Sequence, residues 1–374
     1  MRNKKILIIG MVDSIHLGRW VAQFENSDVR IRIFPSSHFR TVHPKLREFQ
    51  RTRYKLLPSL LGIGVLDTLL TFRLVSSKLS NIVRSFYLWI YITVLKPDIV
   101  HAVEIQHAGY LLRKYITKSG RRIILTNWGS DIFFFQNNDK HRQLITNALA
   151  IATDYSAECQ RDYKLATDFG FEGHFLPCIP NAGGFADHDG TSELASTRNL
   201  ILVKSYGGVF GLGEMSLKVV SEVLQRNRKV RVIAYSVTKD LEQFAQSIAE
   251  QFPARFGFFT LRNSISQTEM MTLFQDARIY LGCSRSDGLS TSFLQALVCG
   301  TYPIQTNTSC ADELVGKGVS ASIVKPEYDE VLKNVIKALE DDNLVDRAQI
   351  SNVAFANEFL SEERIRKLAF TYYQ

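Results

Sequence analysis

The sequence predicts an α/β protein with two similar domains, and three observations support this prediction. Short apolar runs alternate with helix-like patterns through most of the 374 residues. A polar stretch at residues 187–198 interrupts the alternation, which then starts again. The length also suits two or three domains of roughly 150 residues each. Strands separated by helices indicate parallel sheets, which bind ligands beyond the carboxyl ends of their strands. We therefore expect two parallel sheets that face each other across a cleft.

The first half of the chain opens with an apolar run that superficially resembles a secretory leader. This run, Ile6–Val12, is short and ends at Asp13 without a small-residue cleavage site, so a first strand explains it better. The strands expected in this half lie at residues 5–10, 30–34, 98–101, 122–126 and 154–157, and the helices at 16–24 and 159–169.

The second half follows a segment of loop-forming residues at 177–184. Its expected strands lie at residues 200–203, 230–235, 258–261, 279–282 and 302–305, and its helices at 214–225, at 289–299 and from 342 onward. The domains expected from this pattern are residues 1–185 and 195–355.

The positive charge of the chain is concentrated between Arg40 and Lys96. This insert holds ten Lys or Arg and two acidic residues, so its net charge equals the +8 of the whole chain. Apolar runs such as Phe86–Leu95 interleave with the charge. The pattern suits the surface of an anionic membrane, and a solvated lobe with its own small core explains it as well. We expect no nucleic-acid partner, because no nucleic-acid-binding module is recognisable.

No transmembrane helix is expected. Phe86–Leu95 has ten residues, whereas a span needs roughly 20. The five cysteines are odd in number and are not spaced as metal ligands. They predict buried thiols in a reducing compartment and no metal site. We therefore expect a cytoplasmic protein, peripheral on the inner face of a membrane.

The segment Ser284–Gly300 carries the strongest functional signal. A strand is expected to end just before it, and a helix is expected to begin near Leu289. The first turn of a helix presents unpaired N–H groups and a positive dipole end, which suit a diphosphate. Asp287 would accept hydrogen bonds from sugar hydroxyls, and Gln295 would reach a ribose. A capped helix packed in a core is the alternative explanation.

This segment resembles the donor site of the family-4 retaining glycosyltransferases of the GT-B fold. That family shows two glutamates separated by seven residues, followed by Ala-Met-Ala-Cys-Gly-x-Pro-Val-Ile. Here Asp287 and Gln295 take the two positions, and Ala-Leu-Val-Cys-Gly-Thr-Tyr-Pro-Ile follows. The resemblance covers most of the chain and implies two Rossmann-like domains, with a last helix at 356–374 that returns to the first. The further motifs that carry it are Asp13–His16, Lys96–His101 and Trp128–Asp131.

The resemblance also implies a mechanism. A nucleoside-diphosphate sugar would bind to the second domain, an acceptor would bind to the first, and transfer would retain the anomeric configuration. Basic side chains and helix N-termini would stabilise the leaving diphosphate without an essential metal or other cofactor. The residues implied in donor binding are Ser14, Lys204, Arg285, Gly288, Leu289, Ser290 and Gln295.

Two departures from the family pattern fall on this site. The family has an arginine and a lysine in the loop after the first strand of the second domain, where this chain has Ser205 and Phe210. Of the cations expected in this region only Lys204 remains, with help from Arg285. The second departure is Gln295, whose amide hydrogen-bonds hydroxyls but carries no charge. We expect donor affinity or donor choice to differ from the family norm. An ordinary strand-to-helix loop is the alternative explanation for the Lys204 region.

In the first half, the family often has a histidine where this chain has Trp128. Asp131 is then the best-placed group for binding the transferred sugar or positioning the acceptor hydroxyl, with a helix cap as the alternative. His101 and His107 suit proton transfer near neutral pH, with a structural role as the alternative for each. Ser14, or the aspartate before it, caps the next helix. The candidate catalytic residues are Asp287, Asp131, His101 and His107.

The expected function is sugar transfer to a glycan or lipid-linked acceptor in the assembly of a cell-surface polysaccharide. Two alternatives remain open. A sugar-nucleotide epimerase of the same fold would act on the donor without an acceptor. A non-catalytic partner subunit is favoured by Trp128, Phe210 and Gln295, which depart from the family pattern.

Overall fold

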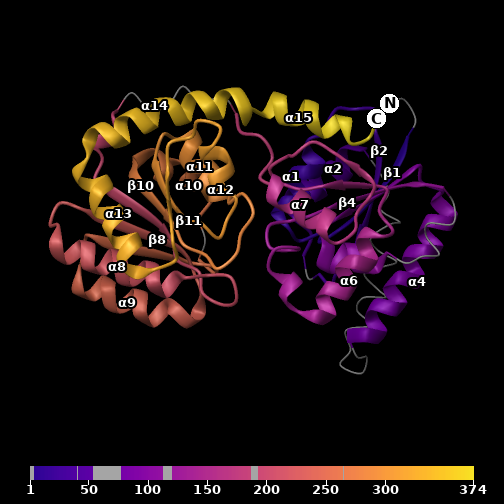
Figure 1. Cartoon of the computed structure of the whole chain (residues 1–374), viewed down its shortest axis with the longest axis horizontal. Coiled ribbons are helices and arrows are strands. Elements are labelled where there is room, and N and C mark those ends of the chain that lie inside the picture. The colour runs from indigo at the N-terminus through magenta and orange to yellow at the C-terminus, as the bar shows by residue number, and fades with distance from the viewer. Residues whose placement is uncertain (1–3, 40, 54–76, 113–119, 187–192, 264) are drawn as a thin grey trace. The chain divides into compact units, whose positions relative to one another are not determined.

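The computed structural model describes residues 4–39, 41–53, 77–112, 120–186, 193–263 and 265–374. The chain divides into two compact units. Unit 1 comprises Met1–Gly183 and Glu363–Gln374, and unit 2 comprises Gly184–Glu362. Each unit holds one six-stranded sheet with helices packed against it, which confirms the predicted two-domain α/β fold (Figure 1).

The sheet of unit 1 is parallel, in the order β2-β1-β3-β4-β5-β6. The chain first adds β2 on one side of β1 and then returns to add β3 on the other side. This reversal places a topological switch point between β1 and β3, where a crevice opens beyond the carboxyl ends of the strands. The strands are β1 (Lys5–Gly10), β2 (Arg30–Pro35), β3 (Ile99–Val103), β4 (Arg122–Thr126), β5 (Asp154–Ser156) and β6 (His174–Phe175).

Helices cover both faces of this sheet because successive side chains of its strands point to opposite faces. Leu7 and Ile9 of β1 pack in one core layer, which includes residues of α4, and Ile6 and Ile8 pack in the other, which includes residues of α1 and α15. The helices are α1 (Ile15–Ala22), α2 (Pro44–Arg53), α4 (Ser77–Leu95), α6 (Asp139–Leu149), α7 (Gln160–Asp168) and α15 (Glu362–Thr371), with a π-helix at Ile105–Gly109 and a 3₁₀ turn at Phe135–Asn137.

The sheet of unit 2 is also parallel, in the order β12-β11-β10-β7-β8-β9. Its switch point lies between β7 and β10, which are neighbours in the sheet although two other strands separate them in the chain. The strands are β7 (Leu200–Lys204), β8 (Arg231–Val237), β9 (Phe256–Thr260), β10 (Ala277–Gly282), β11 (Tyr302–Thr306) and β12 (Ser322–Val324).

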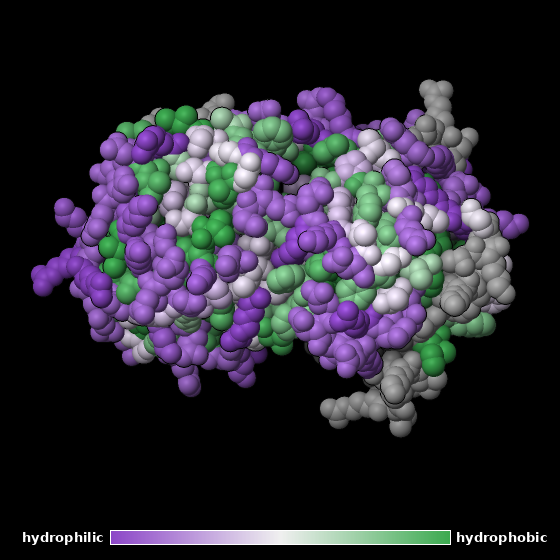
Figure 2. All heavy atoms as spheres, viewed as in Figure 1, coloured by the Kyte–Doolittle hydropathy of each residue, from purple (hydrophilic) through white to green (hydrophobic). Residues whose placement is uncertain are grey.

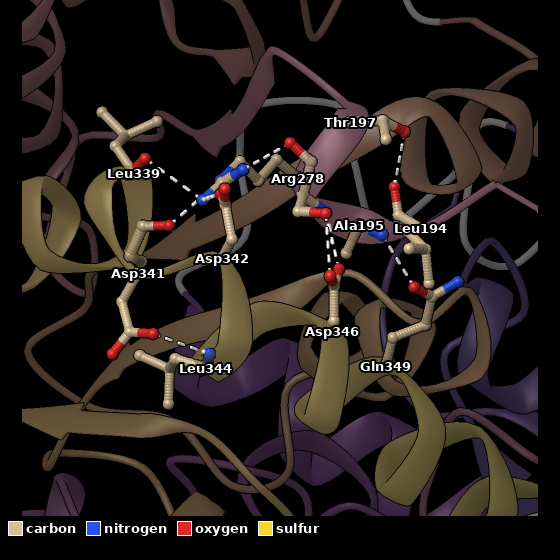
Figure 3. Close-up of polar contacts among 12 residues, drawn as sticks. Leu194, Ala195, Thr197, Arg278, Leu339, Asp341, Asp342, Leu344, Asp346 and Gln349 are labelled. Atoms are coloured by element: carbon tan, nitrogen blue, oxygen red, sulfur yellow. Dashed lines mark hydrogen bonds and ion pairs between the residues drawn. The ribbon is translucent and has the colours of Figure 1, made fainter.

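The helices of unit 2 surround its sheet, and α14 is attached by a polar network (Figure 3). Arg278 of β10 is buried, and its guanidinium donates to the carbonyl oxygens of Ser196, Ala338 and Leu339 and to Asp342. A buried guanidinium is tolerated when its N–H groups are paired in this way. The helices are α8 (Gly213–Arg226), α9 (Glu242–Gln251), α10 (Gln267–Asp276), α11 (Thr291–Val298), α12 (Ala311–Val315), α13 (Tyr328–Glu340) and α14 (Asp342–Phe359), with 3₁₀ turns at Ala195–Thr197 and Lys239–Leu241.

Several predicted boundaries differ from the structure. The helix expected at Leu289 begins at Thr291, because Ser290, with φ −56° and ψ 124°, has a non-helical backbone. Strand β9 begins two residues before the predicted Phe258. The short strands β6 and β12 were not expected, since two or three residues leave no periodic pattern. Much of the basic insert at 40–96, including Lys55 and Arg73, lies outside the described residues.

Candidate functional site

Two loops meet at the switch point of unit 2, and hydrogen bonds hold them side by side. One is the glycine-rich loop after β7, and the other is the Asp-Gly loop after β10. The Arg285 N–H donates to the carbonyl oxygen of Phe210 at 2.7 Å, and the Leu212 N–H donates to that of Cys283 at 3.3 Å. The predicted phosphate loop and the predicted sugar loop therefore occupy the same edge of one sheet.

Lys204 ends β7 at this edge, paired in register with Gly282 of β10 and Tyr235 of β8. Its side chain is half-buried, and its ammonium nitrogen lies 4.8 Å from the centre of the Tyr206 ring. Burial and the nearby Asp287 both raise the pKa of Tyr206. The Lys204 cation and the Asp287 carboxylate therefore both lie near Tyr206.

The glycine-rich loop brings backbone to the surface of a pocket. The Gly207 N–H donates to the Thr238 hydroxyl at 2.9 Å, and a side chain at Gly207 would collide with the Asp240 carboxylate. The pocket has a volume of about 540 Å³, and glycines of the loop line it together with Lys218, Asp240 and Arg285. Where these glycines line the pocket, the absence of side chains lets the backbone approach an anion closely.

The Asp-Gly loop places Asp287 at the carboxyl edge of the sheet. The Asp287 N–H donates to the carbonyl oxygen of Thr308 at 3.2 Å, and Asp287 Oδ1 accepts from the Gly288 N–H at 2.9 Å. The side chain is half-buried. Ser290 is the N-cap of α11, but its hydroxyl makes no capping bond. Helix α11 begins two residues beyond the predicted position, and its N-terminus lies next to this loop.

Gln295, the residue predicted to reach a ribose, belongs to α11. It is buried within α11, and its amide nitrogen lies 3.6 Å from the Met271 sulfur of α10. In this rotamer the amide NH₂ group faces a neighbouring helix. The prediction that Gln295 binds the ribose therefore requires a rotation of the side chain.

In unit 1, the loop after β1 holds Ser14 and His16. Ser14 is the N-cap of α1, and its hydroxyl accepts from the His16 N–H at 3.2 Å. This makes Ser14, rather than the preceding Asp13, the capping residue. The His16 ring lies 5.3 Å from the ring of Trp128, which follows β4. The loops after β1 and β4 therefore meet at the carboxyl edge of this sheet.

Asp131 joins the loop after β4 to the end of β3. Its Oδ2 accepts from the Ile105 N–H at 2.7 Å and from the Trp128 N–H at 3.1 Å. Burial raises the pKa of Asp131 to about 7, and the two backbone donors moderate the increase. Asp131 is therefore poised to change its protonation near neutral pH. The helical turn nearby begins only at Phe135, so Asp131 does not cap it.

His101 lies in the core of unit 1 and not at an open site. The side chain is fully buried, with Nδ1 at 2.8 Å from the Tyr373 hydroxyl and Nε2 at 2.6 Å from the Thr126 hydroxyl. Burial, with the positive charge of Arg122 nearby, lowers its pKa to about 3. A neutral ring with both nitrogens occupied favours a structural role over proton transfer. His107 is exposed on the π-helix that follows β3.

Glu104 is a candidate that sequence reasoning missed. It is buried directly after β3, and its backbone has φ 102° and ψ 149°. Its Oε1 accepts from the Ser36 hydroxyl at 3.0 Å and from the Ala108 N–H at 3.2 Å. Burial, with Asp131 nearby, raises the pKa of Glu104 well above its usual value. Non-glycine residues at such φ values concentrate at functional sites. Nothing in the sequence around Glu104 signals this conformation.

Comparisons with known proteins agree with this arrangement. A family model described as "Glycosyl transferases group 1" matches residues 214–354, and one described as "Glycosyl transferase 4-like" matches residues 5–155. No curated protein matches the sequence.

Solved structures extend the similarity to nearly the whole chain. Anabaena HepE in complex with UDP-glucose is 13% identical, with 99% of each chain covered and a TM-score of 0.71. Sucrose-phosphate synthase from Thermosynechococcus elongatus is 11% identical, with 99% and 98% covered and a TM-score of 0.70. S. aureus MnaA with UDP is 12% identical, with 99% and 97% covered and a TM-score of 0.65. At these identities the likeness shows the fold.

Proposed function

Because the chain belongs to the GT-B glycosyl transferases of group 1, we propose that it transfers a sugar from a nucleoside-diphosphate sugar to a glycan or lipid-linked acceptor, with retention. One observation carries the proposal. The glycine-rich loop after Lys204 and the loop that holds Asp287 are hydrogen-bonded to each other at the switch point of unit 2. That edge of a parallel sheet is where nucleotides bind.

Each part of this edge suits one part of the donor. The Lys204 ammonium group, the glycine-rich backbone and the N-terminus of α11 suit the diphosphate, since all present positive charge or N–H groups. Arg285, on the Asp287 loop, adds a second cation. The Asp287 carboxylate suits the hydroxyls of the transferred sugar, because a carboxylate accepts hydrogen bonds only. These groups stabilise the leaving diphosphate without a metal ion. Transfer should therefore continue in excess EDTA.

The switch point of unit 1 suits the acceptor. Its polar groups include Asp131, Glu104 and His107, and the first two have raised pKa values. Carboxyl groups that hold a proton near neutral pH can donate hydrogen bonds to an acceptor hydroxyl and can accept them after ionisation. We assign Asp131 the positioning of the acceptor hydroxyl.

The cellular setting belongs to the same proposal. The +8 charge of the insert at 40–96 favours an acceptor anchored in an anionic membrane. We place the protein in the cytoplasm, peripheral on the inner face of that membrane, in assembly of a cell-surface polysaccharide. Within the described ranges, no helix combines the length and apolar character needed to cross a bilayer.

The decisive experiment has two stages. Thermal-shift screening against nucleoside-diphosphate sugars, with UDP-glucose among them, identifies the donor as the compound that raises the melting temperature. The labelled donor is then incubated with membrane lipids and with the protein alone, and NMR reports the anomeric configuration of the product. Label in a lipid or glycan product with retained configuration supports the proposal. Epimerised donor without acceptor would overturn it in favour of an epimerase, and binding without turnover would favour a partner subunit.

A further inference from the structure

Helix α4 is apolar on two opposite faces. One face packs into the core of unit 1, where Leu88 and Ile92 are fully buried and the Ser85 hydroxyl donates to the carbonyl oxygen of Leu111 at 3.0 Å. Tyr91 extends this packing, with its ring 5.9 Å from that of Phe34. This face alone explains why the helix stays attached to the unit.

The opposite face is an exposed apolar stripe. Its five side chains follow the spacing of one helical face over three turns. The rings of Phe86 and Trp89 lie 5.6 Å apart and are tilted by 31° to each other, so they are neighbours on this surface. The stripe consists of Ile82, Phe86, Trp89, Ile90 and Val94.

Such a cluster of exposed apolar side chains on one helix is unusual for this chain. Hydrophobic and hydrophilic side chains are mixed over the face seen in Figure 2, as on most protein surfaces. Among the described residues, no element other than α4 carries more than two large apolar side chains that are exposed. Val94 is 73% exposed, the highest value among them. A helix that is apolar all round is normally covered on both sides.

Either a second copy of the chain or a lipid surface could cover the stripe, and the charge of the surrounding sequence distinguishes between these two partners. The insert that contains α4 carries the whole +8 of the chain. A second copy docked through the same stripe would bring two such inserts together, and the like charges would repel. An anionic lipid surface would attract the insert, at roughly 1 kcal/mol for each Lys or Arg near the surface. Charge complementarity therefore favours lipid.

The chemistry of the stripe fits the same partner. Tryptophan and tyrosine concentrate at the boundary between lipid headgroups and acyl chains, and Trp89 lies between Tyr87 and Tyr91 in the sequence. A helix that presents an exposed apolar face to a membrane lies in the plane of the boundary, with that face buried by roughly 5–10 Å. We infer that α4 is the membrane-docking element, which lies flat on an anionic bilayer with this stripe inserted. The inference rests on the membrane contact proposed above.

The test uses the full chain and lipid vesicles with no sugar donor present. Flotation with vesicles of phosphatidylcholine and phosphatidylglycerol (1:1) should recover the protein, and pure phosphatidylcholine should recover much less. The double variant Phe86→Ser/Val94→Ser should bind at least tenfold more weakly, given the apolar area removed. Ile350→Ser is the matched control, because Ile350 on α14 is 70% exposed and should leave binding unchanged.

Trp89 provides a second measurement, which reports how deeply the stripe enters the bilayer. Its fluorescence should shift to the blue on binding and be quenched by lipids brominated along their acyl chains. Trp89→Phe should remove that response, because Trp20 is buried in unit 1 and Trp128 packs against His16. Equal vesicle binding by the wild type and the double variant would overturn the inference, as would no binding by the wild type.

If something other than lipid covers the stripe, the same variants should give different results. A dimer that the double variant abolishes in light scattering would assign the stripe to a second copy and overturn the inference. A melting temperature lowered by several degrees in the double variant, but not in Ile350→Ser, would show that the stripe packs within the chain and would also overturn the inference. Asp287→Ala should bind vesicles like the wild type, so a failure of sugar transfer is separable from a failure of docking.

Discussion

The Tyr373 hydroxyl lies 2.8 Å from Nδ1 of His101 and joins the end of the chain to the third strand of unit 1. Trp20 Nε1 donates to the same hydroxyl at 2.9 Å. The hydroxyl therefore directs its own proton to Nδ1, and the His101 ring carries its proton on Nε2, facing the Thr126 hydroxyl at 2.6 Å. All these side chains are buried, so each depends on the others for its hydrogen bonds.

Tyr373→Phe should lower the stability of unit 1 by about 1–3 kcal/mol. The substitution keeps the ring but leaves Trp20 Nε1 and His101 Nδ1 buried without partners, and unsatisfied buried groups cost about that much. Urea unfolding followed by tryptophan fluorescence measures the change. Tyr328→Phe is the control, because the half-buried Tyr328 loses one bond to Glu222 in unit 2. Equal midpoints for Tyr373→Phe and wild type would show that the network adds no stability.

Asp131→Asn should change how stability depends on pH. The pKa of Asp131 is about 7 in the folded chain, against an ordinary value of 3.8. Below pH 3.8 the carboxyl is protonated in both the folded and the unfolded chain, so its ionisation does not change the free energy of unfolding. Between pH 3.8 and 7 the unfolded chain ionises first, so wild-type stability falls as pH rises. Relative to wild type, the variant should gain roughly 2–4 kcal/mol between pH 4 and pH 8. A constant difference across this range would contradict the raised pKa.

The backbone at Glu104 predicts an order of stability for two substitutions. With φ at 102°, a side chain is strained by about 1–3 kcal/mol, whereas glycine accepts the conformation. Both Glu104→Gly and Glu104→Ala lose the bonds to Ser36 and Ala108. Glycine should therefore be the more stable by about 1–2 kcal/mol, after its own entropy cost is subtracted. Chemical denaturation of the two variants tests this, and an equal or more stable alanine variant would show that the backbone is unstrained.

Some features of the fold and of the candidate site could be predicted from the sequence, and others could not. Strands such as β10 were predictable because a strand buried on both faces leaves a continuous apolar run. The loop at Asp287 was predictable because turn residues follow that run directly. The start of α11 was not, since Leu289 is buried ahead of the helix and the non-helical backbone of Ser290 leaves no sequence pattern. The role of His101 depends on Tyr373, 272 residues away, and the rotamer of Gln295 depends on Met271. Local patterns carry no information on such partners.

Asp287→Ala should abolish sugar transfer and leave the fold intact. In the proposed function the carboxylate binds the transferred sugar, and losing such a group costs roughly 10²–10³-fold in kcat. Circular dichroism and the melting temperature should match those of the wild type. Asp312→Ala is the control, since Asp312 is exposed at the start of α12 in the same unit. Transfer by Asp287→Ala at a rate close to that of the wild type would show that the sugar does not bind at this loop.

Lys204→Ala should weaken binding of the nucleoside-diphosphate product. Lys204 stands at the carboxyl end of β7, beside the glycine-rich loop, and hydrogen bonds that involve a charged group contribute about 1.5–3 kcal/mol. The dissociation constant for UDP, measured by calorimetry, should therefore rise roughly 10- to 100-fold.

Salt provides an independent check on the Lys204 cation. Wild-type affinity for UDP should fall as salt is raised, and the Lys204→Ala variant should respond less, because one attractive charge is gone. Lys229→Ala is the control, since Lys229 is exposed near the amino end of β8, at the opposite edge of the same sheet. If Lys204→Ala and Lys229→Ala bind UDP equally well, the diphosphate does not lie beside β7, and the α11 N-terminus with Arg285 becomes the site to test.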